Sequence, residues 1–384
     1  MSKQVLFTTR WYEMREHLGV LHYAQKYRWD VYSSHHMPDA VFKVPDLDGL
    51  IVEFGPKDRT RIEMARRFKG PIVALEDYGS GLHVPRVHAD NHAIGRMAAQ
   101  HFIERGFTRF MTLCRANHRY VHQRIAGFHE GIESADPNEC LDIRLNRKRQ
   151  PIYSNNGTHK PKSFDKILTT LKGPVGVFCI DDDDATELIR QLLQEGVAVP
   201  EEVAVVGVNN DPLVCPFARV PISSIDPDFE AIGYRAAQLL NRMMRGEEVE
   251  TKTYCVQPKG IVVRRSSDIR AVEDVQVAKA IRFIWDHSTQ WRSINHIAEH
   301  VGLATRTLQW RFKKVMGYSL QDEMIRSRID RIKEELIQTD KPIRQIADEM
   351  DFSSVQYLIR LFSKQTGISP LKFRREHRPQ KEQK

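Results

Sequence analysis

The 384-residue sequence has no long apolar run and few cysteines. No stretch approaches the roughly 20 consecutive apolar residues of a membrane span. The amino terminus enters Val5-Leu6-Phe7 directly, so we expect no secretory leader. Five cysteines are present and none forms a CxxC pair, which favours buried free thiols over disulfides. These absences predict a cytoplasmic protein without a membrane partner.

Motifs for catalysis and for metal binding are also lacking. The sequence has no phosphate-binding GxxxxGK[ST] loop and no nucleophile elbow. His118 and His122 have the spacing of a zinc helix, but no HExxH glutamate and no third ligand accompany them. The acids of Asp181–Asp184 stand at an expected helix start, where caps and dipole partners are the usual roles. We therefore expect no catalytic residues, no metal and no cofactor.

The positive charge is concentrated near the carboxyl terminus. Residues 271–384 hold 21 Lys and Arg against 15 Asp and Glu, which is +6 of the chain's net +8. An excess of this kind in one segment favours a polyanionic partner.

A pattern between Ile294 and Pro370 occurs twice. INHIAEHVGLATRTLQWRFKKVMGYSL starts at Ile294, and IRQIADEMDFSSVQYLIRLFSKQTGISPL starts at Ile343. The Ile-Ala pair recurs 49 residues on, whereas the later Phe, Gly and Ser recur 50 residues on. One extra residue is therefore expected in the second copy's turn or at the start of its last helix.

Each copy has the layout of a helix-turn-helix. A short amphipathic helix with Ile-Ala is followed by a tight break and a longer helix with apolar residues at helical spacing. We expect Thr305 and Ser353 or Ser354 to cap the longer helices, and Gly317 and Gly367 to end them. A plain helical bundle is the alternative, but two copies in register favour binding to double-stranded DNA.

Exposed positions early in each longer helix are expected to face base edges. By pattern these are Thr305, Arg306, Gln309, Trp310, Val355, Gln356, Tyr357 and Arg360. We expect Leu308, Phe312, Leu358 and Phe362 to be core residues. Lys313, Lys314, Lys364, Arg374 and Arg375 are expected to contact phosphate or solvent.

The first 268 residues alternate apolar strands with amphipathic helices, which predicts two doubly wound lobes with parallel sheets. The expected strands are 5–8, 29–33, 47–53, 71–76, 110–114, 142–145, 175–180 and 203–208, with a last strand after Pro258; the expected helices are 12–27, 59–68, 91–105, 121–134, 163–171, 184–195 and 229–245.

Polar side chains follow the carboxyl ends of these strands, where such folds bind ligands. Carboxylates, amides and an arginine beside a tryptophan suit a small polyhydroxylated ligand, because they pair with hydroxyls while an indole packs on a sugar ring. The candidates are Arg10, Trp11, Glu76, Asp77, Arg124, Asp182 and Asn209. A core position for Trp11 is the alternative.

Several stretches resemble the sugar-sensing core of the LacI/GalR repressors and the periplasmic sugar-binding proteins. They are VHADNHAIGRMAAQHFIERGFTRF, RIAGF, VFCIDDDDA, GVAVPEEVAVVGVNND and ISSIDPDFEAIGYRAAQLL. The resemblance covers roughly Lys3 to Arg265 and implies that Asp182 and Arg124 bind sugar hydroxyls. Asn209 stands where many relatives carry Asp. We expect no DNA-binding headpiece before Val5.

The repeats, with their FKK and GISP…FR endings, resemble the AraC/XylS activator DNA-binding domain. The resulting domains are a sensor at 1–268, a linker at 269–276 and a DNA-binding domain at 277–384, with helix-turn-helix units at about 294–316 and 343–366. Helices are expected at 277–286 and 320–337.

The combined resemblance implies a sugar-responsive transcription activator, with D-xylose as the expected effector, a homodimer on DNA half-sites, and RNA polymerase as a further partner. A repressor, or a regulator responding to another pentose or hexose, is the first alternative. An α/β enzyme acting on sugars is the second, and it lacks the catalytic pair that it would need.

Overall fold

The structure is a computed structural model that describes residues 2–35, 46–77, 79–115, 118–133, 139–145, 151–153, 174–269, 271–272, 274–290 and 293–377. The chain forms two compact units. The first covers Met1–Pro200 and Ala204–Asp268, and the second covers Ile269–Lys384 with the short segment Glu201–Val203.

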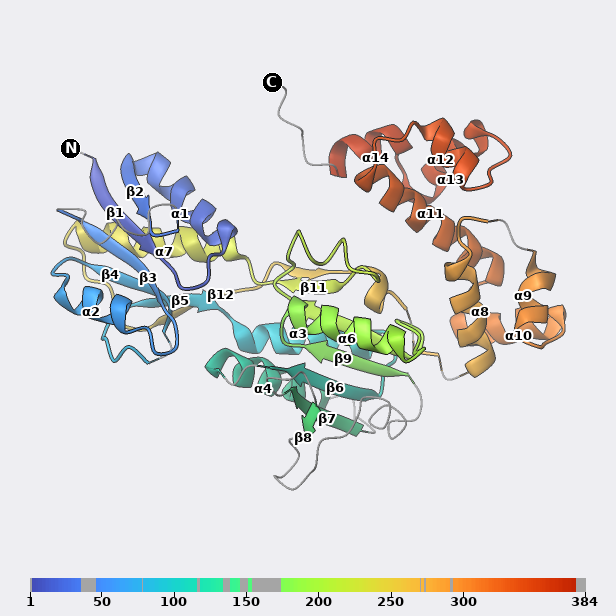
Figure 1. Ribbon diagram of the computed structural model, residues 1–384, viewed down its shortest axis with the longest axis horizontal. Coiled ribbons are helices and arrows are strands. Elements are labelled where there is room, and N and C mark those ends of the chain that lie inside the picture. Colours follow the sequence, from blue (N-terminus) through green and yellow to red (C-terminus); the bar gives the residue numbers. More distant parts are fainter. Residues whose placement is uncertain are drawn as a thin grey trace. The chain divides into compact units, whose positions relative to one another are not determined.

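The first unit contains two sheets, each the centre of one lobe (Figure 1). Lobe A has six parallel strands in the order β12-β5-β4-β3-β1-β2. Its strands are β1 (Lys3–Thr8), β2 (Trp29–Ser33), β3 (Gly49–Phe54), β4 (Ile72–Asp77), β5 (Arg86–Ala89) and β12 (Thr253–Val256), and its helices are α1 (Met14–Tyr27), α2 (Arg59–Arg67) and α7 (Phe229–Met244).

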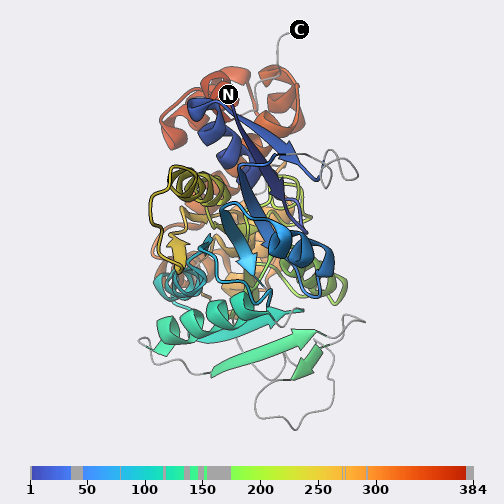
Figure 2. The same ribbon diagram turned by 90° about the vertical axis from the view of Figure 1, so that its left-hand side faces the viewer.

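Lobe B has seven strands in the order β13-β11-β10-β9-β6-β7-β8, and its two edge strands, β13 and β8, pair antiparallel. Its strands are β6 (Arg109–Cys114), β7 (Glu139–Leu145), β8 (Pro151–Tyr153), β9 (Val175–Cys179), β10 (Val203–Val208), β11 (Ser223–Asp226) and β13 (Gly260–Val262). Its helices are α3 (Asn91–Glu104), α4 (Arg119–Glu133) and α6 (Asp182–Gln194), and Figure 2 shows α4 in teal beside the light-green β7.

Burial on both faces explains these sheets. Every residue of β3 and of β10 is buried, as expected for parallel strands covered by helices on both sides. In lobe A, α1 and α7 pack with their backbones in contact: a Cβ on Gly19 would clash with the Glu230 carbonyl, and one on Gly233 with the Glu16 carbonyl. The chain passes between the lobes at β5–α3, β11–α7 and β12–β13.

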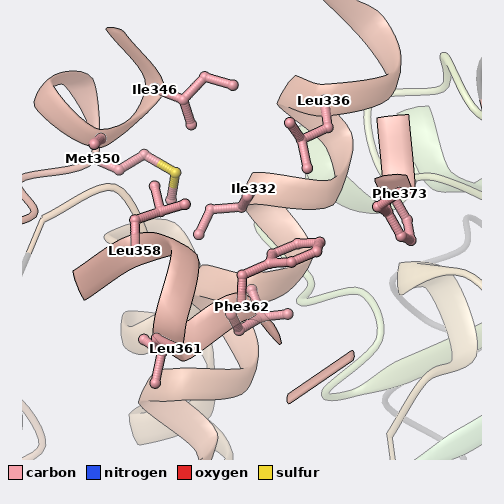
Figure 3. Close-up of a cluster of buried hydrophobic side chains, with 10 residues drawn as sticks. Ile332, Leu336, Ile346, Met350, Leu358, Leu361, Phe362 and Phe373 are labelled. Atoms are coloured by element: carbon pink, nitrogen blue, oxygen red, sulfur yellow. The ribbon is translucent and has the colours of Figure 1, made fainter. Parts of the chain in front are cut away.

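The second unit is helical, with α8 (Val275–Asp286), α9 (Ile294–His300), α10 (Thr305–Met316), α11 (Leu320–Gln338), α12 (Ile343–Glu349), α13 (Val355–Thr366) and α14 (Pro370–His377). Helix α11 belongs to two cores. Near its start, Glu323 accepts hydrogen bonds from Trp285 and Tyr318. Near its end, Ile332 and Leu336 pack with α12, α13 and Phe373 of α14 (Figure 3).

The predicted fold class is confirmed: two α/β lobes precede a helical domain with two helix-turn-helix units. The strands β5, β11 and β12, each of four residues, were not predicted. The expected helix at 163–171 lies outside the described residues. None of the helices in the described ranges combines the length and apolar character that a bilayer crossing requires.

Candidate functional site

A cavity of about 440 Å³ lies between lobes A and B, at the carboxyl ends of their strands. In both sheets the strand order reverses there, between β1 and β3 and between β6 and β9, which is the usual ligand position in doubly wound folds. The cavity is lined by Trp11, Tyr12, Glu13, Glu16, Glu53, Leu75, Glu76, His88, Ala89, Asn91, His118, Tyr120, Arg124, Asp181, Asn209, Phe229 and Ile232.

Glu53 fixes the loop that carries Trp11. Glu53 is the penultimate residue of β3, and its buried carboxylate accepts hydrogen bonds from the backbone N–H groups of Arg10 and Trp11, at 2.9 and 3.0 Å. The Trp11 side chain is 52% exposed and lines the cavity, which excludes the core alternative for it. An indole held in this way offers a flat apolar face to a ligand.

Arg124 is held on the opposite side of the cavity. It is buried, and it donates from Nε to the Asn91 side chain at 2.9 Å and from Nη1 to the Ile180 carbonyl at 2.6 Å. Its guanidinium lies 5.0 Å from the ring of Tyr120, which also lines the cavity. These partners place the guanidinium before any ligand arrives.

The structure does not support the predicted role of Asp182. This side chain is 2% exposed and does not line the cavity. Its oxygens accept from the Ser224 hydroxyl at 2.6 Å and the Asp211 N–H at 2.9 Å, so it braces the β10 and β11 ends. The preceding residue, Asp181, faces the cavity while it caps α6 through the Asp184 N–H. Because positions 181–184 are four consecutive aspartates, the sequence does not indicate which of them faces the cavity.

Of the other predicted sugar-binding residues, some line the cavity and others do not. Glu76 and Asn209 line the cavity. Arg10 does not; its side chain packs over Gly55, and its guanidinium lies 5.9 Å from the Trp11 ring. The side chain of Asp77 lies outside the described residues. Sugar contacts of the four lining candidates, Trp11, Glu76, Arg124 and Asn209, remain predictions.

Arg15 connects the two lobes beside the cavity. From α1 in lobe A, Arg15 donates to the Asn209 and Asn210 carbonyls of lobe B, at 2.9 and 3.3 Å. Its guanidinium is paired with Glu13 and lies 4.7 Å from the Phe229 ring. Asn209 and Asn210 both have positive φ, 112° and 47°, which costs free energy in residues other than glycine.

Several carboxylates share the cavity, and burial is the main influence on them. It raises the pKa of Glu53 to about 7, despite the two N–H donors, and it raises the pKa of Glu16 well above its ordinary value, with Glu53 and Glu13 adding repulsion. Burial also raises the pKa of the Tyr120 phenol to about 12. The cavity thus presents both hydrogen-bond acceptors and donors, as a polyol requires.

Sequence reasoning missed several lining residues for a common reason. Glu16 and Phe229 lie in the first turn of a helix, and His88 lies inside a short strand. The prediction considered only the loops after the strands, whereas the cavity is also lined by residues that lie within helices and strands. An acid in the first turn of a helix has the same pattern whether it caps the helix or faces a ligand.

In the second unit, α9–α10 forms the first helix-turn-helix and α12–α13 the second. Leu308, Phe312, Leu358 and Phe362 are fully buried, as predicted. Gly302 and Asp351 occupy equivalent turn positions with φ of 71° and 54°. The longer helices start three residues after Gly302 but four after Asp351, so the extra residue lies in the second turn.

The predicted caps are partly wrong. Ala304, without a side-chain hydrogen bond, precedes α10, and Thr305 instead pairs with the Asn295 side chain at 2.9 Å. Ser354 caps α13, and Gly317 and Gly367 end both helices in the left-handed region, as predicted.

The base-reading candidates are presented on the outer faces of α10 and α13. Arg306, Gln309, Trp310, Gln356 and Arg360 are exposed, whereas Thr305, Val355 and Tyr357 are half-buried. Val355 packs against the core of Figure 3, which leaves less of it for a partner. Tyr357 lies between the Phe352 ring at 5.8 Å and the Arg360 guanidinium at 5.6 Å.

One expected phosphate contact has a structural role. Arg374 donates to the Leu336 and Lys341 carbonyls, which satisfies backbone groups at the end of α11 and just beyond it. Lys313, Lys314 and Lys364 are exposed, and the ammonium of Lys314 lies 5.0 Å from the Trp310 ring.

All five cysteines are free thiols; Cys114, Cys179 and Cys215 are buried, Cys140 is half-buried and Cys255 is exposed. His118 lines the cavity, and His122 is exposed on α4.

Comparison with known proteins agrees with this architecture. A periplasmic binding protein-like domain matches residues 99–267, and a helix-turn-helix domain matches residues 297–376. The chain is thus a transcription regulator that joins a periplasmic-binding-protein-like domain to a helix-turn-helix DNA-binding domain, and its relatives are regulators rather than enzymes.

Relatives that cover nearly the whole chain include xylose operon regulatory proteins. Those of Haemophilus influenzae and Escherichia coli K12 are 25% and 26% identical over 366 and 372 residues, or 94% of this chain and 93% and 92% of theirs. A solved structure of a xylose-binding transcription activator matches with a TM-score of 0.75 and 22% identity, over 99% of each chain, and so shares the fold.

Proposed function

We propose that the protein is a cytoplasmic transcription activator that binds D-xylose between lobes A and B and DNA through α10 and α13. The proposal rests on one observation: a cavity with the chemistry of a polyol site shares a chain with two helix-turn-helix units, and xylose operon regulators match along 94% of that chain.

The cavity chemistry supports a small uncharged sugar. Glu76 and Asn209 come from opposite lobes, so a hydroxylated ligand would contact both. Trp11 and Phe229 offer apolar faces to the C–H groups of the ring. A ligand that contacts both lobes favours the arrangement in which they are close, and this difference in affinity drives the population shift.

Two reading helices that differ in sequence imply a directional half-site. Arg306, Gln309 and Trp310 on one helix, and Gln356 and Arg360 on the other, would contact different bases. We propose that a homodimer places four such units on two half-sites. Segment 269–276, whose last two residues begin α8, would link the sensor to the DNA-binding domain, and the bound dimer would recruit RNA polymerase.

Two measurements test the proposal. Calorimetry with xylose, arabinose, ribose, glucose and galactose should show binding of a pentose in the micromolar to millimolar range. Trp11→Ala should weaken that binding, whereas the neighbouring Arg10→Ala, whose side chain does not line the cavity, should not. If no sugar of this panel binds, the sensor assignment is wrong.

The second measurement is binding to the DNA upstream of the protein's own gene, with and without the sugar. Tighter and more specific binding with sugar supports an activator, and release by sugar would establish the alternative, a repressor. A promoter–reporter assay then gives the sign of regulation independently of affinity.

A further inference from the structure

A second polar cluster lies in lobe B, apart from the sugar cavity. It contains the imidazole of His129 on α4 and the side chains of Cys140 and Asp142 on β7, none of which lines the cavity. One ligand atom from each lies within 4.8 Å of the others, and all three residues are half-buried.

The fold explains this convergence. Cys140 and Asp142 are two residues apart on a strand, so their side chains point to the same face of the sheet. Helix α4 runs beside β7 in both views of the molecule (Figures 1 and 2). It brings His129 Nε2 to 3.0 Å from each carboxylate oxygen of Asp142.

The carboxylate is held from the neighbouring strand. Thr112 is the register partner of Asp142 on β6, and its hydroxyl donates to Asp142 Oδ1 at 2.7 Å. A hydrogen bond of this kind orients a metal-binding carboxylate, as outer-sphere partners do in metalloproteins.

We propose that His129, Cys140 and Asp142 bind a divalent transition-metal ion of the Zn²⁺ class, with water or another small ligand in the fourth position. Imidazole, thiolate and carboxylate are the three donor types that zinc uses in proteins. Tetrahedral coordination at zinc bond lengths separates donor atoms by about 3.3–3.6 Å. In this structure His129 Nε2 lies 3.0 Å from the Asp142 oxygens, and the donor atoms of all three residues lie within 4.8 Å of one another. A divalent ion with one thiolate, one carboxylate and one neutral imidazole has no net charge, which suits a half-buried position.

The ion would tie α4 to β7. Helix α4 also carries Arg124, which is five residues before His129 and lines the sugar cavity. Metal binding would therefore fix the helix that presents one wall of that cavity, although the metal site itself does not depend on the sugar assignment.

The test uses the untagged full-length protein, stripped of metal with a chelator and titrated with Co²⁺. We expect one Co²⁺ per chain, with a thiolate-to-cobalt absorption band in the near ultraviolet and intense tetrahedral bands in the visible, all lost on addition of Zn²⁺. Cys140→Ser should remove the thiolate band. His129→Gln and Asp142→Asn should weaken binding, and Thr112→Val, which keeps all three ligands, should weaken it by about 10–100-fold.

Matched controls separate this site from other donors. Cys255→Ser removes the exposed thiol, and His122→Gln removes an exposed histidine of the same helix; neither should change the spectrum. Circular dichroism of each variant verifies folding. The proposal is overturned if wild-type protein gives no thiolate band at millimolar Co²⁺, or if the band persists in folded Cys140→Ser protein.

Discussion

The Nε2 atom of His101 lies 2.7 Å from the Oγ atom of Ser267, and both side chains are buried. His101 lies near the end of α3, whose first residue, Asn91, lines the cavity between the lobes and accepts a hydrogen bond from Arg124. Ser267 lies one residue before Asp268, where the sensor unit ends. One helix therefore contacts the cavity at its start and the last segment of the sensor near its end.

The burial of His101 predicts a pH dependence of stability. Burial, aided by nearby Arg105, lowers the pKa of His101 to about 3, whereas an unfolded histidine titrates near 6.5. Below about pH 6.5 the unfolded chain binds a proton that the folded protein does not. The contribution of His101 is therefore full above pH 6.5 and decreases as the pH falls toward 3, by up to a few kcal/mol.

Denaturant unfolding at several pH values between 7 and 4 measures this effect. His101→Gln should lose less stability than wild type over that range, because it removes one proton-binding difference. The exposed His122→Gln should follow wild type. Parallel curves for His101→Gln and wild type would contradict the assignment.

A second prediction concerns communication. If α3 carries the sugar signal to the linker, Ser267→Ala should reduce the effect of sugar on DNA affinity while sugar affinity changes little. DNA titrations with and without sugar, combined with calorimetry, give the coupling free energy, which is typically about 1–3 kcal/mol. The test is needed because a position along a helix is not by itself evidence that the helix transmits a signal. Unchanged coupling free energy in Ser267→Ala would exclude transmission through α3.

Arg15 supplies a third prediction. Arg15→Gln removes a charged donor from two carbonyls of the facing lobe, and hydrogen bonds to charged groups contribute about 1.5–3 kcal/mol. Because the contact favours close lobes, we expect sugar affinity to fall by roughly tenfold or more. Arg190→Gln, on exposed α6 surface, serves as the charge-matched control. Equal affinities of Arg15→Gln and wild type would show that the contact persists regardless of ligand.

The fourth prediction concerns base recognition by α13. Arg360 is exposed and its guanidinium lies beside Tyr357, which restricts its orientation. Arg360→Ala should weaken binding to the specific site by about 1–3 kcal/mol and spare sugar binding. Lys364→Ala, one turn further along, should weaken specific and nonspecific DNA alike and reduce the salt dependence. Fluorescence anisotropy with both DNA types distinguishes them; equal losses in Arg360→Ala would assign it to phosphate contact.

The regular elements were predictable because their burial repeats along the sequence. Strand β10 is recognisable in the sequence as six apolar or glycine residues in a row. Several helix ends are marked by a following glycine, as at Gly106, Gly196 and Gly246. Short strands such as β5 and β12 have no such signal in the sequence, because a four-residue segment becomes a strand only by pairing with its neighbour.

The binding residues were less predictable for a geometric reason. Asp181 and Asp182 are adjacent and identical, yet one faces the cavity and the other accepts hydrogen bonds from Ser224 and Asp211. Which of the two turns inward depends on the start of α6 relative to β9. Similarly, Arg374 appears as a basic tail residue in sequence and becomes a carbonyl partner only when α14 meets α11.

The length of α11 has a consequence for the rotational phase of the two units. Its 19 residues extend about 28 Å, near the 34 Å repeat of DNA. One residue inserted near its middle would rotate one unit by about 100° relative to the other, although it would lengthen the helix by only about 1.5 Å. Each half alone could still meet a groove, but both could not do so on one face of the duplex. The length of α11 thus sets the rotation of the two units relative to each other, as well as the distance between them.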